Sequence, residues 1–484
     1  NSLSRDALIM LVKKSTTFEM NVDEAALSLH FSGDFPPFNQ LASWQQIAGF
    51  LKSELNYVPL ENPHFFFSQN KGLQSAGNLY LLSETTKQDE LEAAIVEQIV
   101  HVIAREKLNI NPEKHPWLVE GLANYYKHLY IQKYYPDKKL LGPFAETKIA
   151  RLFDIDHYPI RYQNRMLYLY MNRQGLDQPL SDPSSAFPRA NREAVIKGKS
   201  ALFFSYVRNY TSERNFKRSM HYWLQQAPEE SNPEDFLEAI RYYHNQNVDW
   251  VLGDLYGTNK KLDYKLKRTE NCSSVYTATV KNKGDLLVPF PITGYKEGKP
   301  LLTEWFVGHQ KKKTVQIHLE DYSEVKIDGQ ESMPEYTQKN NTVRTSGVFK
   351  QFQPLKLQFY TSFENPNKTQ LFWLPSLKYN AYDQFLIGAQ FYNTNLFRKP
   401  FEYKFSPEYS TGTGQLTGAA STRFNWTPHS SLFHLISFGV YAKYYHYAAD
   451  LAYFRLSPTL TFNFKKSSPS SEWIRTLRLR TVSV

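Results

Sequence analysis

Hydrophobic and polar positions follow three different periods along this chain. From about residue 88 to 270, apolar side chains such as Leu91, Ile95 and Ile99 recur every three or four residues, which places them on one face of a helix. At residues 231–234 an N-cap residue precedes proline and an acidic first turn, so a helix is predicted to begin there. This part of the chain is therefore predicted to be mainly helical.

The period changes to two after about residue 273. Short apolar runs at residues 275–280, 286–292 and 314–319 are separated by glycine and proline, a pattern typical of a small β-sandwich. The polar stretch 330–346 that follows is predicted to be a loop or linker.

The strands then become longer and strictly two-faced. Between residues 452 and 464 every even position is apolar, whereas the odd positions from Arg455 to Asn463 are polar. A transmembrane β-barrel needs strands of about ten residues with one apolar and one polar face. A soluble sandwich is the alternative, but its strands usually have about five or six residues. Strand length therefore favours the barrel, of which only about eight strands fit into this chain.

These patterns predict a multidomain protein. A mainly helical domain at residues 1–270 is followed by a β-sandwich and linker at 271–345 and by truncated strands of an antiparallel transmembrane β-barrel at 346–484. A length of 484 residues suits several domains.

Composition narrows the possible functions. The chain has 33 Tyr, 33 Phe and a mean hydropathy of −0.53, and it contains no apolar run of about 18 residues, so no transmembrane helix is predicted. Its only cysteine, Cys272, excludes an internal disulfide and a cysteine metal site. The net charge of +10 is spread along the chain, so no nucleic-acid partner is predicted.

Chemistry-bearing residues gather in two neighbouring segments. Glu97, Gln98 and His101 occupy one predicted helix, and eighteen residues separate His101 from Glu120 in the phrase Trp-Leu-Val-Glu-Gly-Leu-Ala-Asn-Tyr. This phrase and spacing resemble the aminopeptidase N family of gluzincin zinc peptidases. The resemblance implies a thermolysin-like helical domain, a helix with the pattern His-Glu-x-x-His and a glutamate on the next helix as third zinc ligand.

The chain departs from this family at the positions that carry chemistry. Glu97 stands where the family has its first ligand histidine, and Gln98 stands at the general base. An amide cannot take a proton from water. Gln74 replaces the glutamate that receives the substrate amine, and Val195 replaces the tyrosine that stabilises the oxyanion. We therefore expect a degenerate site, a pseudopeptidase that is not an enzyme.

Two interpretations remain open for the surviving pair, His101 and Glu120. They form an interhelical hydrogen bond, or with Glu97 they form a residual metal site, since a carboxylate can replace imidazole as a ligand. Glu120 can also pair with a basic neighbour. We expect no cofactor, with zinc as the alternative.

The segment 375–383, which leads into residues 385–392, resembles the first strands of Gram-negative outer-membrane proteins. A peptidase-like region fused to such a barrel is an arrangement associated with Bacteroidota. The predicted function is a non-catalytic binding or scaffold subunit of an outer-membrane complex. Its predicted partners are outer-membrane lipid, other outer-membrane proteins and unfolded peptide. The alternatives are an outer-membrane metallo-aminopeptidase with altered ligands, and a transport or channel protein with a soluble lid.

Loop lengths predict the side of the membrane. Outer-membrane barrels have short periplasmic turns and longer outer loops. If strands run near 382–392, 400–409, 415–427, 434–446, 450–464 and 472–484, the shorter connections follow the second and fourth strands. This places residues 1–345 in the periplasm, with the cell surface as the alternative.

Overall fold

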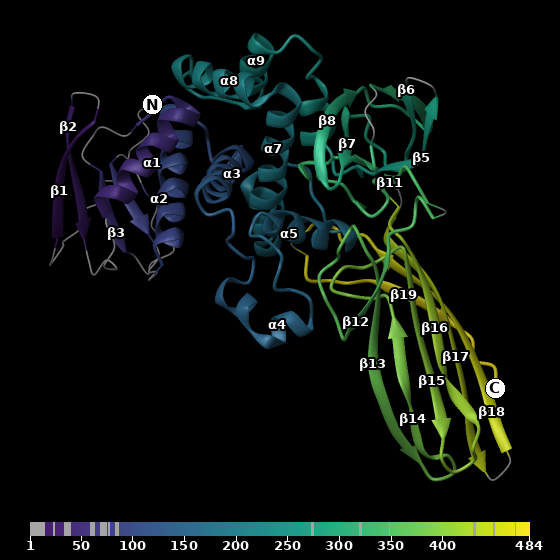
Figure 1. Ribbon diagram of the computed structural model, residues 1–484. Helices are drawn as coiled ribbons and strands as arrows, with labels where there is room; N and C mark the ends of the chain where they lie inside the picture. The colour runs from purple at the N-terminus through teal and green to yellow at the C-terminus, as the bar shows by residue number, and fades with distance from the viewer. Residues whose placement is uncertain are drawn as a thin grey trace. The chain divides into compact units, whose positions relative to one another are not determined.

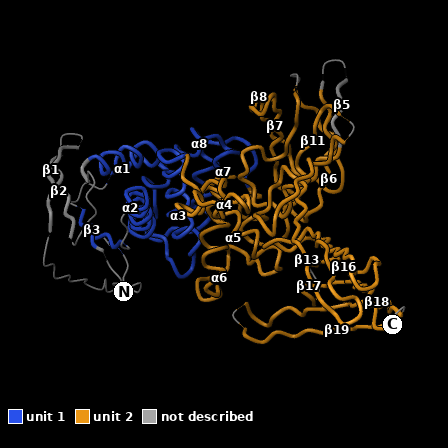
Figure 2. Tube along the Cα trace, turned by 60° about the horizontal axis from the view of Figure 1, so that its bottom comes forward, with its two compact units in different colours: residues 1–136, 207–248 blue, residues 137–206, 249–484 orange. Residues whose placement is uncertain are grey.

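The computed structural model describes residues 15–22, 25–32, 40–58, 63–67, 75, 78–82, 87–272, 275–318, 322–347, 349–428, 432–448, 451–469 and 471–484 (Figure 1). The chain forms two compact units that are discontinuous in sequence. Unit 1 contains residues 1–136 and 207–248, and unit 2 contains residues 137–206 and 249–484 (Figure 2).

Unit 1 combines a four-stranded sheet with a group of helices. The sheet has the order β1-β2-β3-β4, in which β1 and β2 are antiparallel and the other neighbours are parallel. Its strands are β1 (Ser15–Val22), β2 (Ala25–Ser32), β3 (His64–Phe67) and β4 (Leu79–Leu82). The helices are α1 (Gln40–Leu55), α2 (Gln88–Val102), α3 (Pro116–Tyr134), α8 (Glu213–Gln225) and α9 (Pro233–Tyr243), and Ile103–Lys107 extends α2 as a π-helical turn.

The predicted start of α9 is confirmed. The side chain of Asn232 accepts a hydrogen bond from the backbone N–H of Glu234 at 2.8 Å, and Asp235 accepts one from the backbone N–H of Asn232 at 2.7 Å. Pro233 occupies the first helical turn, where its missing N–H costs no hydrogen bond. This reciprocal capping satisfies backbone donors that the first turn leaves unpaired.

A buried carboxylate connects α1, α2 and α3. Glu92 of α2 is fully buried and accepts hydrogen bonds from Ser43 at 2.6 Å, from the Tyr130 hydroxyl at 2.7 Å and from the Tyr135 hydroxyl at 2.6 Å. Burial, and then the hydrogen bond to Glu92, raise the pKa of both phenols, so they stay protonated and remain donors. A buried carboxylate with several donors fixes the packing of the helices that supply them.

Unit 2 begins with short helices and continues into two small antiparallel sheets. The helices are α4 (Lys148–Leu152), α5 (Tyr162–Arg173) and α6 (Arg189–Asn191), with 3₁₀ or π segments at Gly142–Glu146, Ser184–Ala186, Arg192–Lys199 and Val251–Tyr256; α7 (Ser200–Thr211) crosses the boundary between the units. One sheet has the order β5-β6-β9, and the other has the order β11-β10-β7-β8. Their strands are β5 (Tyr264–Cys272), β6 (Val275–Asn282), β7 (Phe290–Lys296), β8 (Lys299–Phe306), β9 (Lys312–Ile317), β10 (Glu324–Ile327) and β11 (Thr342–Arg344).

Two details differ from the pattern read from the sequence. The predicted boundary at residue 270 falls inside β5, which begins at Tyr264. The polar stretch 330–346 contains β11, and Met333 and Glu335 in it are buried. Glu335 accepts a hydrogen bond from the backbone N–H of Tyr264 at 3.0 Å, so this segment packs against β5 instead of forming a free linker.

The C-terminal residues form one eight-stranded sheet in sequence order from β12 to β19. The first pair is parallel and every later pair is antiparallel. The strands are β12 (Leu355–Phe359), β13 (Thr369–Asn380), β14 (Gln384–Tyr392), β15 (Phe401–Ser410), β16 (Leu416–Trp426), β17 (Phe433–Ala448), β18 (Leu451–Phe464) and β19 (Thr476–Arg480). Between the described residues, the outer strands β12 and β19 do not pair with each other, so a closed barrel remains a prediction.

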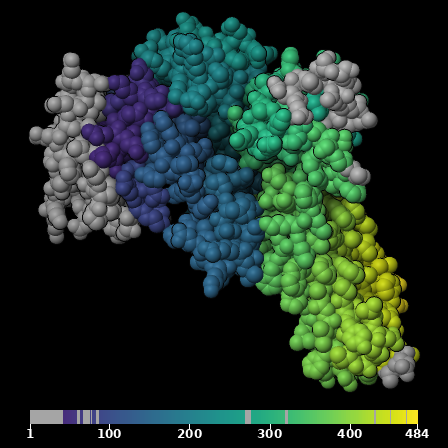
Figure 3. Space-filling model, in the orientation of Figure 1, coloured from purple at the N-terminus to yellow at the C-terminus, as the bar shows by residue number. Residues whose placement is uncertain are grey.

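One face of this sheet is apolar and open to solvent. The strand register aligns Phe424, Phe438, Leu460 and Leu479 in a row across four strands, and the side chains of Phe424 and Leu479 are 55% and 54% exposed. Neighbouring residues in a strand point to opposite faces. In the space-filling view, the green to yellow C-terminal part of the chain is open on the side turned toward the viewer (Figure 3).

The opposite face is polar. Asn425, Ser437, Thr461 and Arg478 form the adjacent row by the same register, and all four line a hollow of about 610 Å³. Strict alternation therefore produces a two-faced sheet. Of the helices in the described ranges, none is long and apolar enough to cross a membrane.

The Glu92 contacts generate a prediction about stability. Replacing Tyr130 by Phe removes one donor to a buried carboxylate, and a hydrogen bond to a charged group is worth about 1.5–3 kcal/mol. We expect Tyr130→Phe to lower the free energy of unfolding by about that amount, measured by chemical denaturation of the purified protein. Tyr134→Phe is the matched control, because the Tyr134 hydroxyl has no hydrogen bond within the described part of the chain. An equal loss in both variants would contradict this role of Glu92.

Candidate functional site

Two ionic contacts connect the facing sides of α2 and α3. His101 Nε2 of α2 lies 3.2 Å from Glu120 Oε2 of α3. One helical turn earlier, Glu97 Oε2 of α2 lies 2.7 Å from Lys127 Nζ of α3. Because α2 advances from 97 to 101 while its partners fall from 127 to 120, the two helices run antiparallel here. The structure thus brings His101 and Glu120 together, as both interpretations of this pair require.

Apolar packing positions these four side chains. Ile99 and Val100 lie on α2 between the charged residues and are buried, as are Val119, Leu122 and Ala123 of α3. The charged side chains lie at the border of this core. Those of Glu97, Lys127, His101 and Glu120 are 17%, 31%, 21% and 34% exposed. A solute can therefore reach the site, which an isolated core contact would not allow.

Gln98, at the position of the family's general base, is held by the neighbouring sheet region. Ser75 Oγ donates to Gln98 Oε1 at 2.7 Å and accepts from the backbone N–H of Leu81 at 2.9 Å. Arg105 donates to the carbonyl oxygen of Ser75 at 3.2 Å. The amide oxygen of Gln98 is thus committed to a hydroxyl donor. Gln74, the predicted amine-binding position, lies outside the described residues.

Val195, at the predicted oxyanion position, belongs to unit 2. It lies in the π segment Arg192–Lys199 and is fully buried. Lys197 in the same segment contacts Glu193 at 3.3 Å. A Cβ atom at Gly198 would lie 3.1 Å from the carbonyl oxygen of Asn164, so glycine allows this segment to approach α5 closely. Val195 is therefore a core residue without a polar group to offer.

The ligand atoms of His101 and Glu120 are spaced as two ligands of one metal ion would be, whereas the carboxylate of Glu97 lies farther from them. Two ligand atoms at about 2.0–2.2 Å from a tetrahedral zinc ion lie about 3.3–3.5 Å apart, close to the 3.2 Å between His101 Nε2 and Glu120 Oε2. Glu97 is on the same helix face but is held by Lys127. It does not converge with the other two to within 4.8 Å. A third ligand from Glu97 would require its ion pair with Lys127 to open.

Another group of potential ligands lies in unit 2. Asp154, Asp156 and His157 are the only three such side chains in the described ranges whose ligand atoms all lie within 4.8 Å of one another. Asp154 Oδ2 already accepts from Lys356 at 2.6 Å and from Gln358 at 2.7 Å. The lysine supplies the positive charge that a cation would otherwise bring, so this group is a closed polar contact.

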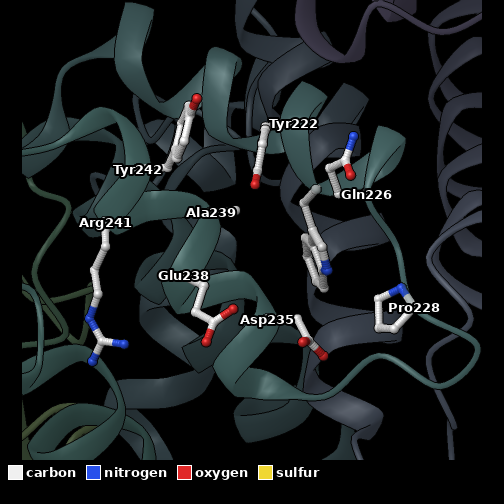
Figure 4. Close-up of a pocket in the computed structure, with 9 residues that line it drawn as sticks. Tyr222, Gln226, Pro228, Asp235, Glu238, Ala239, Arg241 and Tyr242 are labelled. Atoms are coloured by element: carbon white, nitrogen blue, oxygen red, sulfur yellow. The ribbon is translucent and has the colours of Figure 1, made fainter.

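A pocket of about 590 Å³ lies between α8 and α9 of unit 1 (Figure 4). The rings of Tyr222 and Tyr242 stack there at 4.5 Å, and Asp235 and Glu238 add carboxylates to its wall. The Asp235 carboxylate also caps α9. None of the site residues predicted from the sequence lines this pocket. It is therefore separate from the site formed by Glu97, His101, Glu120 and Lys127, the α2–α3 site.

No family model and no curated relative matches the sequence. Among solved structures, the chain is similar to Legionella pneumophila aminopeptidase A in complex with aspartic acid, with a TM-score of 0.47 and 11% identity over 70% of this chain and 39% of that one. It is also similar to an M1 zinc metallopeptidase from Deinococcus radiodurans, with a TM-score of 0.37 and 12% identity over 51% of this chain and 52% of that one. A variant of an M1 zinc metallopeptidase from Deinococcus radiodurans, bound to a Tyr-Ser-Ala substrate, gives 0.35 and 14% over 50% and 51%. The chain thus spans about half or less of these structures.

These comparisons contradict two predictions made from the sequence. The expectation that the chain is not an enzyme and the expectation that it takes no cofactor are withdrawn, because the similar structures are aminopeptidases and zinc metallopeptidases. The physical reason lies at Glu97. Exchanging imidazole for carboxylate replaces one type of zinc ligand by another, so the change does not by itself remove a metal site. The similarity concerns the fold and assigns no role to any residue.

Two residues that shape the site were missed in the sequence. Lys127 lies seven residues after Glu120, two turns along the same helix face, and this spacing could have identified it. Ser75 gives no such signal, because its contact with Gln98 depends on how the chain before α2 folds back.

The Glu97–Lys127 contact generates a prediction about zinc. Lys127→Met frees the Glu97 carboxylate, and a partly exposed ion pair is worth about 0.5–1 kcal/mol, which corresponds to about two- to fivefold in affinity. We expect zinc to bind that much more tightly to Lys127→Met in competition with a chromophoric chelator. Lys114→Met is the control, because it breaks the exposed 2.7 Å pair with Glu230 away from the site. Unchanged or weaker zinc binding in Lys127→Met would exclude Glu97 as a ligand.

Proposed function

We propose that this chain is an outer-membrane protein whose peptidase-like unit binds peptide chains at the α2–α3 site, with zinc held by His101, Glu120 and Glu97. The observation that carries this proposal is the 3.2 Å approach of His101 Nε2 to Glu120 Oε2 across two helices. Both side chains are accessible, and both are zinc ligand types.

The residues of the site have distinct parts in this proposal. When bound, zinc polarises a carbonyl group of the peptide. His101 and Glu120 hold the ion, and Glu97 joins them when Lys127 releases its carboxylate. Lys127 Nζ is then available to an acidic group of the bound chain. Gln98 keeps its hydrogen bond to Ser75 and, as an amide, does not take a proton from water.

The membrane anchor rests on a separate observation, the two-faced C-terminal sheet. The row of Phe424, Phe438, Leu460 and Leu479 lies on an exposed face. An apolar surface of this extent is unusual for a soluble monomer and suits lipid contact, while the polar face lines a hollow. We propose a β-barrel of which these strands form a part, located in a bacterial outer membrane.

A transport function is the second candidate, favoured by the charge of the polar face. Arg398, Arg423, Arg478 and Arg480 line its hollow together with Lys404 and Glu402. Such a lining would favour anions over cations in a water-filled channel. Conductance of the protein in planar bilayers tests this, and an anion preference that falls in Arg423→Gln would support it.

The binding proposal predicts that a single substitution, Glu120→Ala, weakens the binding of both zinc and peptide. We expect Glu120→Ala to lower zinc content by more than half and to weaken binding of a fluorescent peptide, because His101 and Glu97 alone leave zinc with two protein ligands. Zinc is measured by elemental analysis, peptide binding by fluorescence anisotropy and turnover with amino-acid arylamides. Glu230→Ala is the control, since this exposed glutamate forms an ion pair with Lys114 away from the site. Wild-type protein that binds neither zinc nor peptide would refute the proposal.

The anchor proposal predicts unequal losses of stability at two adjacent positions. We expect Leu460→Arg to destabilise the protein in lipid vesicles by about 2–4 kcal/mol, the cost of arginine on a lipid face at mid-depth. Thr461→Arg, one residue further on the polar face, should cost much less. Urea unfolding of vesicle-reconstituted protein, followed by tryptophan fluorescence, measures both. Equal costs at the two positions would mean that lipid does not cover the Leu460 face.

A further inference from the structure

The first long strand of the C-terminal sheet lies earlier than the strand from which the loop-length argument starts its count. The strand expected near 382–392 is β14, and β13 (Thr369–Asn380) precedes it and pairs with it antiparallel from Phe372–Tyr392 to Asn380–Gln384. Each antiparallel strand reverses the direction of the chain. The residues before the sheet therefore meet it at the end opposite to the one that the loop argument assumed.

The connections at the two ends of the sheet differ consistently in length. At one end of the sheet, three residues separate β13 from β14, five separate β15 from β16 and two separate β17 from β18. At the other end, eight residues separate β14 from β15, six separate β16 from β17 and eleven separate β18 from β19. Every connection at the second end is longer than every connection at the first. β13 begins at the end with the long connections.

Side-chain contacts within unit 2 place the preceding helices and small sheets at this same end. Arg173 of α5 donates to both carboxylate oxygens of Glu364, just before β13, at 2.5 and 2.8 Å. Lys261 donates to the hydroxyl and the carbonyl oxygen of Thr427, in the connection 427–432. In Figure 1, β13 and β14, and likewise β15 and β16, are joined at the end of the sheet that lies farther from α5.

A second set of contacts involves β12. Asp154, which follows α4, accepts hydrogen bonds from Lys356 and Gln358 of β12, and Tyr158 donates to the carbonyl oxygen of Phe363 at 3.2 Å. β12 runs parallel to the first five residues of β13. These contacts are independent of loop length, and they identify the same end of the sheet.

In outer-membrane barrels the short turns face the periplasm and the longer loops face outward. We infer that the peptidase-like and sandwich regions lie on the cell surface, so that the peptides reaching the α2–α3 site are extracellular. The inference rests on the proposed anchoring of the C-terminal strands in an outer membrane. It replaces the periplasmic location expected from the sequence, which began its count one strand too late.

Unit 1 follows unit 2 to the same side through the covalent chain. The chain passes directly between the units at residues 136–137, 206–207 and 248–249. The elements of unit 2 on these connections come before the first strand of the C-terminal sheet. The site on α2 and α3 would therefore meet secreted or environmental polypeptides, and not unfolded proteins in transit through the periplasm.

The experiment uses the full protein in the outer membrane of intact Gram-negative cells. In a Cys272→Ser background, Lys299→Cys places a thiol at an exposed position before the sheet, and Tyr382→Cys places one at an exposed short turn. The probe is a polyethylene-glycol maleimide too large to pass porins. We expect Lys299→Cys to be labelled on intact cells, and Tyr382→Cys only after the outer membrane is permeabilised. Added protease should also remove residues 1–345 of the wild-type protein on intact cells.

The outcomes separate the inference from the proposed function. Labelling of Tyr382→Cys alone on intact cells, with wild-type residues 1–345 protected, overturns the cell-surface location but keeps the anchor. Labelling of both or of neither on intact cells shows that the strands do not span the membrane, so the anchor and the inference both fail. If the wild-type protein is absent from the outer-membrane fraction, the anchor and the inference also both fail. The wild-type proteolysis decides the question if a cysteine variant fails to assemble.

Discussion

The position of the candidate site depends on a carboxylate that never meets solvent. Glu92 is fully buried and accepts hydrogen bonds from residues of α1 and α3 and from Tyr135 just beyond α3. An ionised carboxylate in a protein core is costly unless donors surround it, so these helices can pack only in an arrangement that supplies them. Glu97 and His101 lie five and nine residues further along α2, and their partners on α3 are brought opposite by that packing.

In the proposed zinc site, Lys127 and the metal ion would compete for the same group, the carboxylate of Glu97. The magnitudes decide how strong that competition is. A partly exposed ion pair contributes up to about 1 kcal/mol, whereas structural zinc sites with four ligands bind with about 10–16 kcal/mol. Even a site with fewer ligands would gain more from Glu97 than the lysine loses. Lys127 can therefore tune the affinity of the site for zinc, but an ion pair of this kind cannot close it.

The site was predictable where sequence spacing alone defines geometry. The i,i+4 relation of Glu97 and His101 and the motif around Glu120 identified the contact that the structure contains. The contact of Ser75 with Gln98 could not be foreseen, because it depends on the path of the chain between the sheet and α2. The expectation that the altered motif leaves a protein without a metal or an activity was wrong for a different reason. A substitution that changes one ligand type to another leaves the local sequence looking degenerate while the donor atoms remain.

A single strand, β13, decides at which end of the C-terminal sheet the preceding residues lie. Alternation of apolar and polar residues identified the strand around residues 452–464 with little ambiguity, because every even-numbered position in it is apolar. In β13, Phe372, Trp373 and Leu374 are consecutive apolar residues and Pro375 follows, so the period of two is broken. Phe372 is buried with its ring 5.9 Å from that of Tyr392, which explains an apolar side chain on the otherwise polar face. Since each antiparallel strand exchanges the two ends of the sheet, a count that starts at β14 and one that starts at β13 assign the preceding residues to opposite ends. The contacts of Arg173 and Lys261 do not depend on counting, and for this reason they carry more weight than loop length in deciding which end of the strands the preceding domains occupy.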